Sequence, residues 1–221
     1  MPAKTAASKK SALRSRAARI VDTLQQLYPD AVCSLEYETP FRLMVAVRLS
    51  AQCTDARVNL ITPALFARFP DENAMADADV TEIEELIHSC GFYHGKARDL
   101  KGAAQMLRDV YGGVLPDTME ELLRLPGVGR KSANLLLGDV YGKPAIVADT
   151  HCIRISNRLG FCDTKDPYRV ELALKDLIEP AAGSDFCHRL VLFGRDICTA
   201  RSPRCEQCPL AQAGLCPQKL D

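Results

Sequence analysis

Residues 125–131 read Leu-Pro-Gly-Val-Gly-Arg-Lys, and this stretch decides how the rest of the chain is interpreted. A helix is expected before it, because Thr118 and Glu121 have the spacing of a capping box. The apolar segment 132–140 predicts a second helix after it. Two glycines around Val128 allow a tight turn whose N–H groups favour an anion, helped by the positive end of the next helix. From spacing alone, the turn is either a phosphate-binding hairpin or an ordinary connection between helices.

Outward from this turn, apolar residues recur mostly at helical spacing, so we expect an all-α fold. Thr62 before Pro63 predicts a helix cap with proline in the first turn. The longest aliphatic run, residues 43–47, is far too short to cross a membrane. Further short helices are predicted over residues 18–27, 41–50, 54–61, 81–89, 96–111, 118–125, 130–141 and 150–159.

Charge is balanced overall and uneven along the chain. The 221 residues contain 28 basic and 28 acidic side chains, with 47% hydrophobic residues, which excludes intrinsic disorder and a uniformly basic nucleic-acid binder. Residues 1–20 contain six Lys or Arg and no acid, whereas residues 71–85 contain seven acids and no base. One interpretation is a solvated tail and a solvated helix. The other is a molecule with one basic face, in which residues 1–17 form a flexible basic arm.

The ten cysteines are concentrated near the end of the chain. Cys198, Cys205, Cys208 and Cys216 have the spacing C-x6-C-x2-C-x7-C, with prolines restricting the loops between them. This spacing is typical of a site that wraps one compact metal centre, either a zinc ion or an iron–sulfur cluster. The remaining cysteines have no ligand spacing and are expected to be buried apolar residues.

Four motifs in order resemble the endonuclease III family of helix-hairpin-helix DNA glycosylases. They are Leu-Ser-Ala-Gln-Cys-Thr-Asp at 49–55, Gly-Phe-Tyr-x-x-Lys-Ala at 91–97, Leu-Pro-Gly-Val-Gly-Arg-Lys-Ser-Ala-Asn at 125–134 and Val-Ala-Asp-Thr-His at 147–151. The resemblance extends from about residue 18 to Cys216. It implies a six-helix barrel domain over 33–143, with the hairpin at about 118–141. A second domain that carries the iron–sulfur cluster is implied over 18–32 and 144–221, built from both chain ends.

The resemblance also implies an activity. Family members are bifunctional enzymes that excise oxidised or ring-saturated pyrimidines from duplex DNA and then break the abasic strand by β-elimination. One alternative is a monofunctional mismatch glycosylase, although such relatives typically lack a lysine at position 131. Another is an iron–sulfur DNA-binding module that has lost its chemistry, which retention of both Lys131 and Asp149 disfavours.

Lys131 and Asp149 are the candidate catalytic residues. Lys131 is predicted in the first turn of a helix beside Arg130, where the helix dipole and the neighbouring cation favour the free amine that a nucleophile needs. In the family, the matching lysine attacks the sugar C1′ and forms a Schiff base. Asp149 precedes a predicted helix and is expected to cap it. A rigid carboxylate there could stabilise positive charge on the sugar or help to deprotonate Lys131.

The resemblance implies a 4Fe–4S cluster on Cys198, Cys205, Cys208 and Cys216. The family's usual last spacing is x5, so the longer x7 loop makes Cys216 the ligand that departs from the pattern. Arg201 and Arg204 lie in the cysteine-rich loop and are predicted to contact the DNA backbone.

An enzyme that acts at C1′ must take the nucleotide out of the stack and fill the gap. The resemblance assigns the filling role to Gln52 and a wedge in the opposite strand to Phe92, against loop hydrogen bonding and core packing as alternatives. We predict further DNA contacts from residues next to Phe92 and from the hairpin, namely Tyr93, His94, Lys96, Gly127, Val128, Gly129 and Arg130.

The expected partner is double-stranded DNA that carries a damaged pyrimidine or an abasic site, bound by a monomer without a membrane. We expect a bacterial cytoplasmic protein associated with the nucleoid. The basic start of the chain leaves organelle targeting open as an alternative.

Overall fold

The computed structural model describes residues 2–217, with side chains from residue 8 onward. Over these residues it contains helices and no strand, so the predicted all-α fold is confirmed. No described helix combines the length and the apolar character needed to span a membrane. The chain divides into a central unit, Cys33–Tyr141, and a terminal unit, described over residues 2–32 and 142–217.

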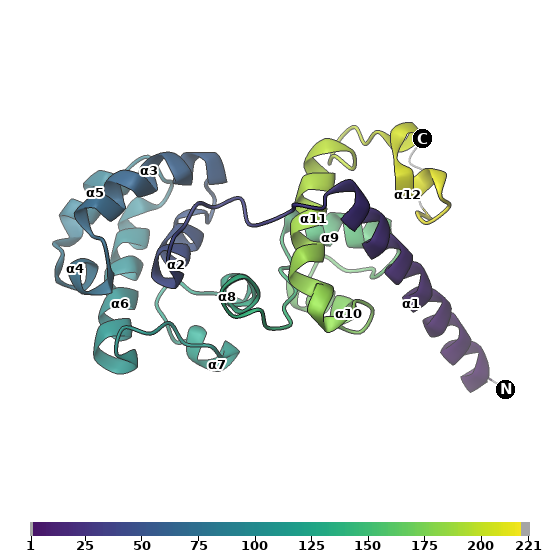
Figure 1. The fold of residues 1–221 in the computed structure, drawn as a ribbon, viewed down its shortest axis with the longest axis horizontal. Helices are drawn as coiled ribbons and strands as arrows, with labels where there is room; N and C mark the ends of the chain where they lie inside the picture. The colour runs from purple at the N-terminus through teal and green to yellow at the C-terminus, as the bar shows by residue number, and fades with distance from the viewer. Residues whose placement is uncertain (1, 218–221) are drawn as a thin grey trace. The chain divides into compact units, whose positions relative to one another are not determined.

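The central unit is built around α2 (Pro40–Leu49), which contacts α3 (Asp55–Arg68), α6 (Tyr93–Tyr111) and α8 (Arg130–Tyr141). Seven of the ten residues of α2 are buried, because the helix is apolar on nearly all sides. The short helices α4 (Glu72–Asp77) and α5 (Val80–Ile87) pack on α6, and α7 (Met119–Leu122) packs on α8 (Figure 1). The two helices of the hairpin are therefore joined to a core that α2 and α6 build.

The helix around Pro63 differs from the prediction. Thr62 does not cap a new helix, because α3 runs unbroken from Asp55 to Arg68 with Pro63 inside it. The cap of α3 is Thr54, whose side chain accepts a hydrogen bond from the Arg57 N–H. Thr62 is instead 3% exposed, so packing of this face into the core outweighs the backbone hydrogen bond that a proline cannot donate.

The terminal unit joins the two ends of the chain. Helix α1 (Pro2–Leu27) lies along α11 (Gly183–Asp196), and the C-terminal α12 (Pro209–Gln212) packs on α1 (Figure 1). Helix α9 (Thr150–Arg158) contacts α10 (Pro167–Lys175) and α11. Short 3-10 helices occupy Pro180–Ala182 and Cys205–Gln207. The apolar face of α1 is fully buried at Ala17, Ile20 and Leu24.

The start of the chain also differs from the prediction of a flexible arm over residues 1–17. Helix α1 already begins at Pro2, and Lys10 and Arg14 both pair with Asp176, at 2.6 and 2.8 Å. Alanine, lysine and arginine are strong helix formers, and tertiary packing of α1 supplies the remaining stability. The rest of the predicted arm, Met1 and the side chains of residues 2–7, lies outside the described part of the chain, as do residues 218–221 of the predicted cluster domain.

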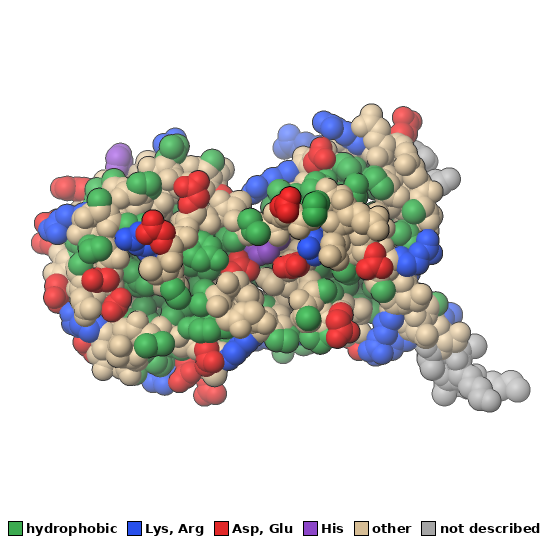
Figure 2. Space-filling model, in the orientation of Figure 1, with side chains coloured by type: hydrophobic (Ala, Val, Ile, Leu, Met, Phe, Trp, Pro, Cys, Tyr) green, Lys and Arg blue, Asp and Glu red, His purple; other side chains and the backbone are tan. Residues whose placement is uncertain are grey.

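Several acidic side chains of residues 71–85 cap helices or form ion pairs within the central unit. Asp71 and Asp79 cap α4 and α5 through their side chains. Glu82 pairs with Arg68 at 2.6 Å, and Glu84 pairs with His94 at 2.7 Å. On the face shown in Figure 2, acidic and basic side chains are interspersed over each unit. The stretch is thus more than a solvated helix, because its charges begin helices and pair with neighbours.

Candidate functional site: a helical hairpin, two strained loops and a cysteine-rich pocket

The hairpin forms as its sequence predicts. The Thr118 hydroxyl accepts a hydrogen bond from the Glu121 N–H at 3.3 Å and bonds the Glu121 carboxylate at 2.9 Å. Helix α7 then ends, and α8 begins at Arg130. Between them, Val128 is 8% exposed and anchors the turn, while Gly127 and Gly129 are exposed. The turn therefore presents backbone without side chains to the solvent.

Gly127 is required by its surroundings. Its φ is +74°, in the left-handed region, and a Cβ there would lie 2.5 Å from Arg48 Nε and 2.9 Å from the Asp99 Cβ. Arg48 of α2 and Asp99 of α6 form a half-buried ion pair, with Arg48 Nε 2.8 Å from Asp99 Oδ2. The hairpin is thus seated on this pair. Neither residue is predicted from the sequence, because their proximity depends on how α2 and α6 pack.

Lys131 is the second residue of α8 and is exposed. The helix is established immediately behind it, since the Ala133 N–H donates to the Gly129 carbonyl at 2.9 Å. Arg130 is half-buried beside it. Lys131 therefore stands at the positive end of a helix dipole with its amine accessible to a bound strand. Its role as nucleophile stays a prediction.

Asp149 belongs to the terminal unit and caps α9. Its Oδ1 accepts a hydrogen bond from the Cys152 N–H at 2.7 Å, which confirms the predicted cap. Residues 145–148 before it are buried, so Asp149 is fixed by the buried segment that precedes it as well as by the capping bond to the helix that follows it. The capping bond uses one carboxylate oxygen and leaves the residue half-exposed.

Two loops of the central unit carry strained backbone. Gln52, after α2, has a φ of 55°, and Phe92, before α6, has a φ of 61°. Within the described residues, they are the two non-glycine positions with positive φ. Gln52 is exposed and Phe92 is 73% exposed, so Phe92 is not a core residue. Strain of this kind is concentrated at functional sites, which agrees with the predicted use of both residues.

Tyr93 and His94 follow Phe92 at the start of α6. Their ring centroids are 4.0 Å apart, and the His94 Nδ1 lies 2.7 Å from a carboxylate oxygen of Glu84. His94 is exposed and Tyr93 is half-buried. Both therefore remain available to a strand that approaches Phe92.

Lys96 contradicts the prediction of a DNA contact. It is 1% exposed, and its Nζ donates to the Leu49 carbonyl at 2.8 Å inside the central unit. Burial lowers the pKa of this ammonium. A side chain enclosed in this way does not reach a phosphate, and the sequence offered no sign of its acceptor 47 residues away.

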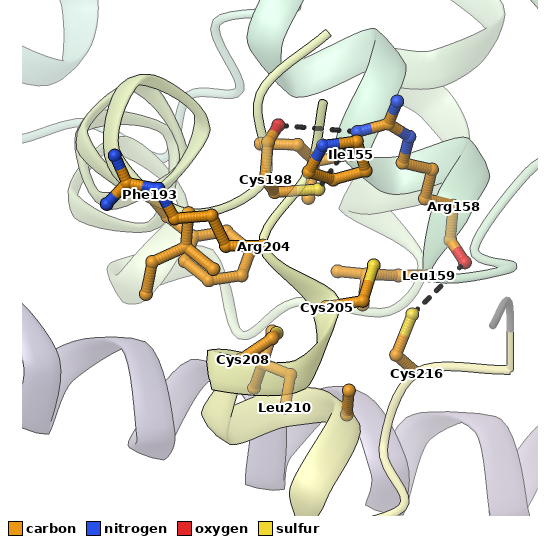
Figure 3. A pocket seen from close by; sticks show the side chains of 13 residues that line it. Ile155, Arg158, Leu159, Phe193, Cys198, Arg204, Cys205, Cys208, Leu210 and Cys216 are labelled. Carbon is orange, nitrogen blue, oxygen red and sulfur yellow. Dashed lines mark hydrogen bonds between the residues drawn. The ribbon is translucent and has the colours of Figure 1, made fainter. Parts of the chain in front are cut away.

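The four candidate ligands Cys198, Cys205, Cys208 and Cys216 line a single pocket of about 420 Å³, open solvent included (Figure 3). Cys216 reaches it although its loop is two residues longer than the family's pattern. Helix α12 and Gly214, with a φ of 66°, lie within this loop. The N–H groups of Leu215 and Cys216 then both donate to the Leu210 carbonyl, at 2.8 and 3.2 Å.

Two arginines of α9 hold the start of the cysteine-rich loop. Arg158 Nη1 donates to the Cys198 Sγ at 3.3 Å, and both residues line the pocket (Figure 3). Nη1 also donates to the Thr199 carbonyl at 2.7 Å, and Nη2 donates to the Ala200 carbonyl at 3.0 Å. Arg154 donates to the Cys198 carbonyl at 3.0 Å, and burial lowers its pKa. Neither arginine is predicted from the sequence. Their spacing of four on one helix was visible, but their acceptors were not.

The last ligand loop is held from α1. Arg16 Nη1 donates to the Leu215 carbonyl at 2.8 Å, and its guanidinium lies 5.7 Å from the centre of the Phe161 ring. Arg201 and Arg204 are exposed in the cysteine-rich loop, and Arg204 lies 3.7 Å from the Asp196 carboxylate. The loop therefore leaves its two predicted DNA contacts facing solvent.

The donor set of this pocket fits an iron–sulfur cluster. Thiolates are the usual protein ligands of such clusters, and a hydrogen bond to a sulfur, as from Arg158 to Cys198, is typical of their surroundings. No three His, Cys, Asp or Glu side chains among the described residues are close enough to hold a single metal ion. Spacing alone does not choose between zinc and iron–sulfur, and the comparison with known families does.

Two family models match the chain. One describes the HhH-GPD superfamily of base excision DNA repair proteins and matches residues 45–180. The other describes the iron–sulfur binding domain of endonuclease III and matches residues 198–212. The second match covers Cys198, Cys205 and Cys208, and Cys216 lies just beyond it. The protein thus carries a 4Fe–4S cluster.

Relatives and solved structures agree with both models. Endonuclease III from Synechocystis is 48% identical over 95% of each chain, and that from Bacillus subtilis is 42% identical over 91% of this chain and 92% of the relative. A solved structure of a trapped endonuclease III–DNA covalent intermediate is 41% identical, with a TM-score of 0.86 over 92% of this chain and 95% of that chain. With the hairpin, the strained loops and the cysteine pocket in place, the chain belongs to the endonuclease III family of HhH-GPD base excision repair proteins.

Proposed function

We propose that this protein excises oxidised or ring-saturated pyrimidines from duplex DNA, with Lys131 as the nucleophile. As a member of its family, it is a bifunctional DNA glycosylase and abasic-site lyase of base excision repair. The observation that carries the assignment of Lys131 is its position, exposed in the first turn of α8 directly after the glycine hairpin. A phosphate bound at the hairpin brings a sugar of the same strand close to this amine.

In the proposed reaction, the free amine of Lys131 attacks C1′ of the damaged nucleotide. The Nζ–C1′ bond forms as the C1′–base bond breaks, and the base leaves with a proton. The C1′–O4′ bond of the sugar ring then breaks, O4′ takes up a proton and C1′ becomes double-bonded to Nζ, which gives the Schiff base. The Schiff base acidifies the C2′ hydrogen, so loss of that proton expels the 3′ phosphate by β-elimination. Water then hydrolyses the Schiff base and restores the lysine. Each step is an acid–base or bond-exchange step that needs no external oxidant or reductant.

Asp149 is proposed as the electrostatic partner of this reaction. Breaking the bond between C1′ and the base builds positive charge on the sugar, and a carboxylate already fixed by a capping bond lowers the free energy of that state without reorganising. The same carboxylate can accept the proton that the lysine ammonium must lose. Its capping bond supports both roles, because it restricts where the second oxygen points.

Direct DNA contacts are proposed for the hairpin, the strained loops and the cysteine-rich loop. Gly127, Val128, Gly129 and Arg130 would bind a phosphate, Gln52 would fill the vacated space, and Phe92 would wedge the opposite strand, with Tyr93 and His94 beside it. Arg201 and Arg204 would bind the backbone. Cys198, Cys205, Cys208 and Cys216 would hold the cluster, which when bound cross-links and shapes the loop that carries these arginines.

The domain assignment follows from the same proposal. The central unit would be the barrel domain of the family, and the terminal unit would be the cluster domain. Bacterial relatives and the duplex substrate support a monomer that acts on the chromosomal DNA of a bacterial nucleoid, with no membrane involved in the reaction.

The test is borohydride trapping on a duplex that carries thymine glycol. The wild-type protein is expected to form a covalent adduct of protein and DNA, and Lys131→Gln is expected to form none and to lose strand cleavage. Lys165→Gln, an exposed lysine elsewhere, serves as the matched control. Release of the base by the wild-type protein without an adduct or strand cleavage would overturn the proposal.

Asp149→Asn separates the cap from the charge. Asparagine caps helices about as well as aspartate, so stability should be retained. We expect base release to fall about a hundredfold, since a fixed electrostatic group commonly contributes that much. If Asp149→Asn retained full activity and Asp149→Ala lost only stability, Asp149 would be a cap and nothing more.

A further inference from the structure

The two strained loops are neighbours in the central unit. Gln52 follows the end of α2, and Phe92 precedes the start of α6. A Cβ on Gly91 would lie 3.7 Å from the Gln52 carbonyl oxygen, and the Sγ atoms of Cys53 and Cys90 are 3.8 Å apart. Gly91, directly before Phe92, therefore lies beside Gln52, and Cys90 lies beside Cys53, the residue after Gln52.

Lys96 joins the same two loops from beneath. It lies in the first turn of α6, and its ammonium donates at 2.8 Å to the carbonyl of Leu49, the last residue of α2. The backbone of Lys96 also bonds Phe92, because the Lys96 N–H donates to the Phe92 carbonyl at 3.2 Å. One residue thus links the end of the helix before Gln52 to the strained position itself in the other loop.

The position of Lys96 is unusual for a lysine. A buried ammonium loses its hydration and is tolerated only where acceptors replace the water. The last carbonyls of a helix lack partners within the helix and lie at the negative end of its dipole, which suits a cation. Burial is the largest cause of the lowered pKa, and the Arg48 cation acts in the same direction. A leucine or methionine would fill this space without that cost, so the amine itself has a use here.

We propose that Lys96 is a positioning residue for strand opening, which holds the Gln52 and Phe92 loops in their strained conformations before DNA binds. This rests on the proposed roles of Gln52 and Phe92 in the duplex. Without the bond to Leu49, the ends of α2 and α6 separate more easily, and both residues relax toward unstrained backbone. DNA binding must then order both loops again, and the free energy needed for this slows the opening of a paired nucleotide.

The test compares two substrates in single-turnover base release. In the first, thymine glycol is paired with adenine in a duplex. In the second, the same nucleotide stands in an unpaired bulge, so little opening is required. We expect Lys96→Met to lower the rate on the paired substrate about tenfold, the loss expected for a charge-assisted hydrogen bond, and to change the rate on the bulge less than about twofold. Lys101→Met, on the same helix, is the matched control.

A double-mutant cycle identifies the loop through which Lys96 acts. If Lys96 acts by holding Gln52, then Lys96→Met should add little to the loss that Gln52→Ala causes on the paired substrate. If it acts by holding Phe92, the same non-additivity should appear with Phe92→Ala. Full additivity with both Gln52→Ala and Phe92→Ala would contradict the proposal. Hydrogen exchange of residues 50–54 and 90–95 in the unbound protein should also become faster in Lys96→Met, and unchanged exchange would contradict it.

The outcomes distinguish failure of the proposed roles of Gln52 and Phe92 from failure of the proposed role of Lys96. If Gln52→Ala and Phe92→Ala spare the paired substrate, the proposed roles of these residues fail. If Gln52→Ala impairs only the paired substrate while Lys96→Met impairs both substrates equally, Lys96 is a general packing residue and the inference fails. Lys96→Gln covers the case in which the methionine variant does not fold, and it should show the same preference for the bulge.

Discussion

The glycine hairpin and the cysteine-rich loop are both short connections that are proposed to bind DNA backbone, yet they are held in different ways. The hairpin, residues 125–131, is held by backbone geometry and packing, with Val128 buried and Gly127 seated on the Arg48–Asp99 pair. The cysteine-rich loop, residues 198–216, has few buried apolar side chains and is held by arginines that donate to its carbonyls.

This difference shows what each loop needs in order to fold. The hairpin needs only the helices on which it rests, because two glycines and a buried valine determine its conformation. The cysteine-rich loop is proposed to need a cluster at its centre and arginines at its edge. Substitutions should therefore act through sterics in the first loop and through lost ligands or lost hydrogen bonds in the second.

The largest effect is expected at the cluster. Cys208→Ala removes a buried thiol that lines the cysteine pocket, and we expect loss of nearly all bound iron together with proteolysis within residues 198–216, since binding of a metal centre and folding of its loop are coupled. Iron content and limited proteolysis measure this. Cys162→Ala, outside the pocket, should retain its iron. If Cys208→Ala kept a full complement, the cluster would not hold this loop.

Gly127→Ala tests the steric side of the comparison. The new Cβ would be placed 2.5 Å from Arg48 Nε in addition to the strain of a φ of +74°, so we expect a loss of about 2–4 kcal/mol in the free energy of unfolding. Gly112→Ala has a similar φ and open space around it, and it should lose about 1–2 kcal/mol from backbone strain. Chemical denaturation followed by circular dichroism measures both. Equal losses of unfolding free energy in the two variants would mean that the Arg48–Asp99 pair moves aside for the new Cβ without a cost in stability.

Arg158→Met tests whether hydrogen bonds hold the cysteine-rich loop. The guanidinium bonds the Thr199 and Ala200 carbonyls, so its removal should lower the free energy of local opening by about 2 kcal/mol. Hydrogen exchange over residues 198–204 reports this opening. Arg19→Met, on the exposed side of α1, should leave the exchange rates unchanged. If hydrogen exchange did not change in Arg158→Met, the cluster alone would hold the loop.

Arg201 and Arg204 test whether the cysteine-rich loop contacts phosphate. Removing either should reduce the slope of the logarithm of DNA affinity against the logarithm of salt concentration by about one. The effect should be smaller for Arg204→Ala than for Arg201→Ala, because Asp196 partly neutralises Arg204. Fluorescence anisotropy at several salt concentrations measures the slope, with Lys165→Ala as control. If neither slope changed, the two arginines would not contact phosphate, and the proposed DNA contacts would be those of the hairpin and the strained loops.

The smallest effect is expected where α1 is attached. A hydrogen bond from Lys10, with the nearby Arg14 cation, lowers the pKa of Asp176 below its ordinary value of 3.8. A lowered pKa in the folded state means that the ionised carboxylate favours folding above 3.8 and that this contribution disappears as the pH falls through the folded pKa. We expect proteolysis of residues 8–16 to rise by about twofold in that range, as for other exposed ion pairs. Asp176→Asn should show the higher rate already at neutral pH, and Asp163→Asn should not. A rate independent of pH would mean that the apolar face of α1 alone attaches it.

The sequence predicted features that depend on neighbours in the chain. Thr118 and Asp149 were identified as caps because a capping bond spans only three residues, and both caps are present. The glycines of the hairpin were identified for the same reason. In contrast, the prediction for Lys96 was wrong because its acceptor, Leu49, lies on another helix. The flexible arm was wrong because Asp176 and the buried surface beneath Ala17 are far along the chain.

The sequence by itself determined the helical class, the hairpin, the cap at Asp149 and the set of four cysteines, because each depends on residue type and short spacing. Only the tertiary structure decided that Gly127 rests on Arg48 and Asp99, that Cys216 reaches the pocket through a longer loop, and that Lys96 is buried between two strained loops. These features depend on which helices pack together. A side chain's burial and its distant partners follow from that packing, and no local pattern of residues encodes them.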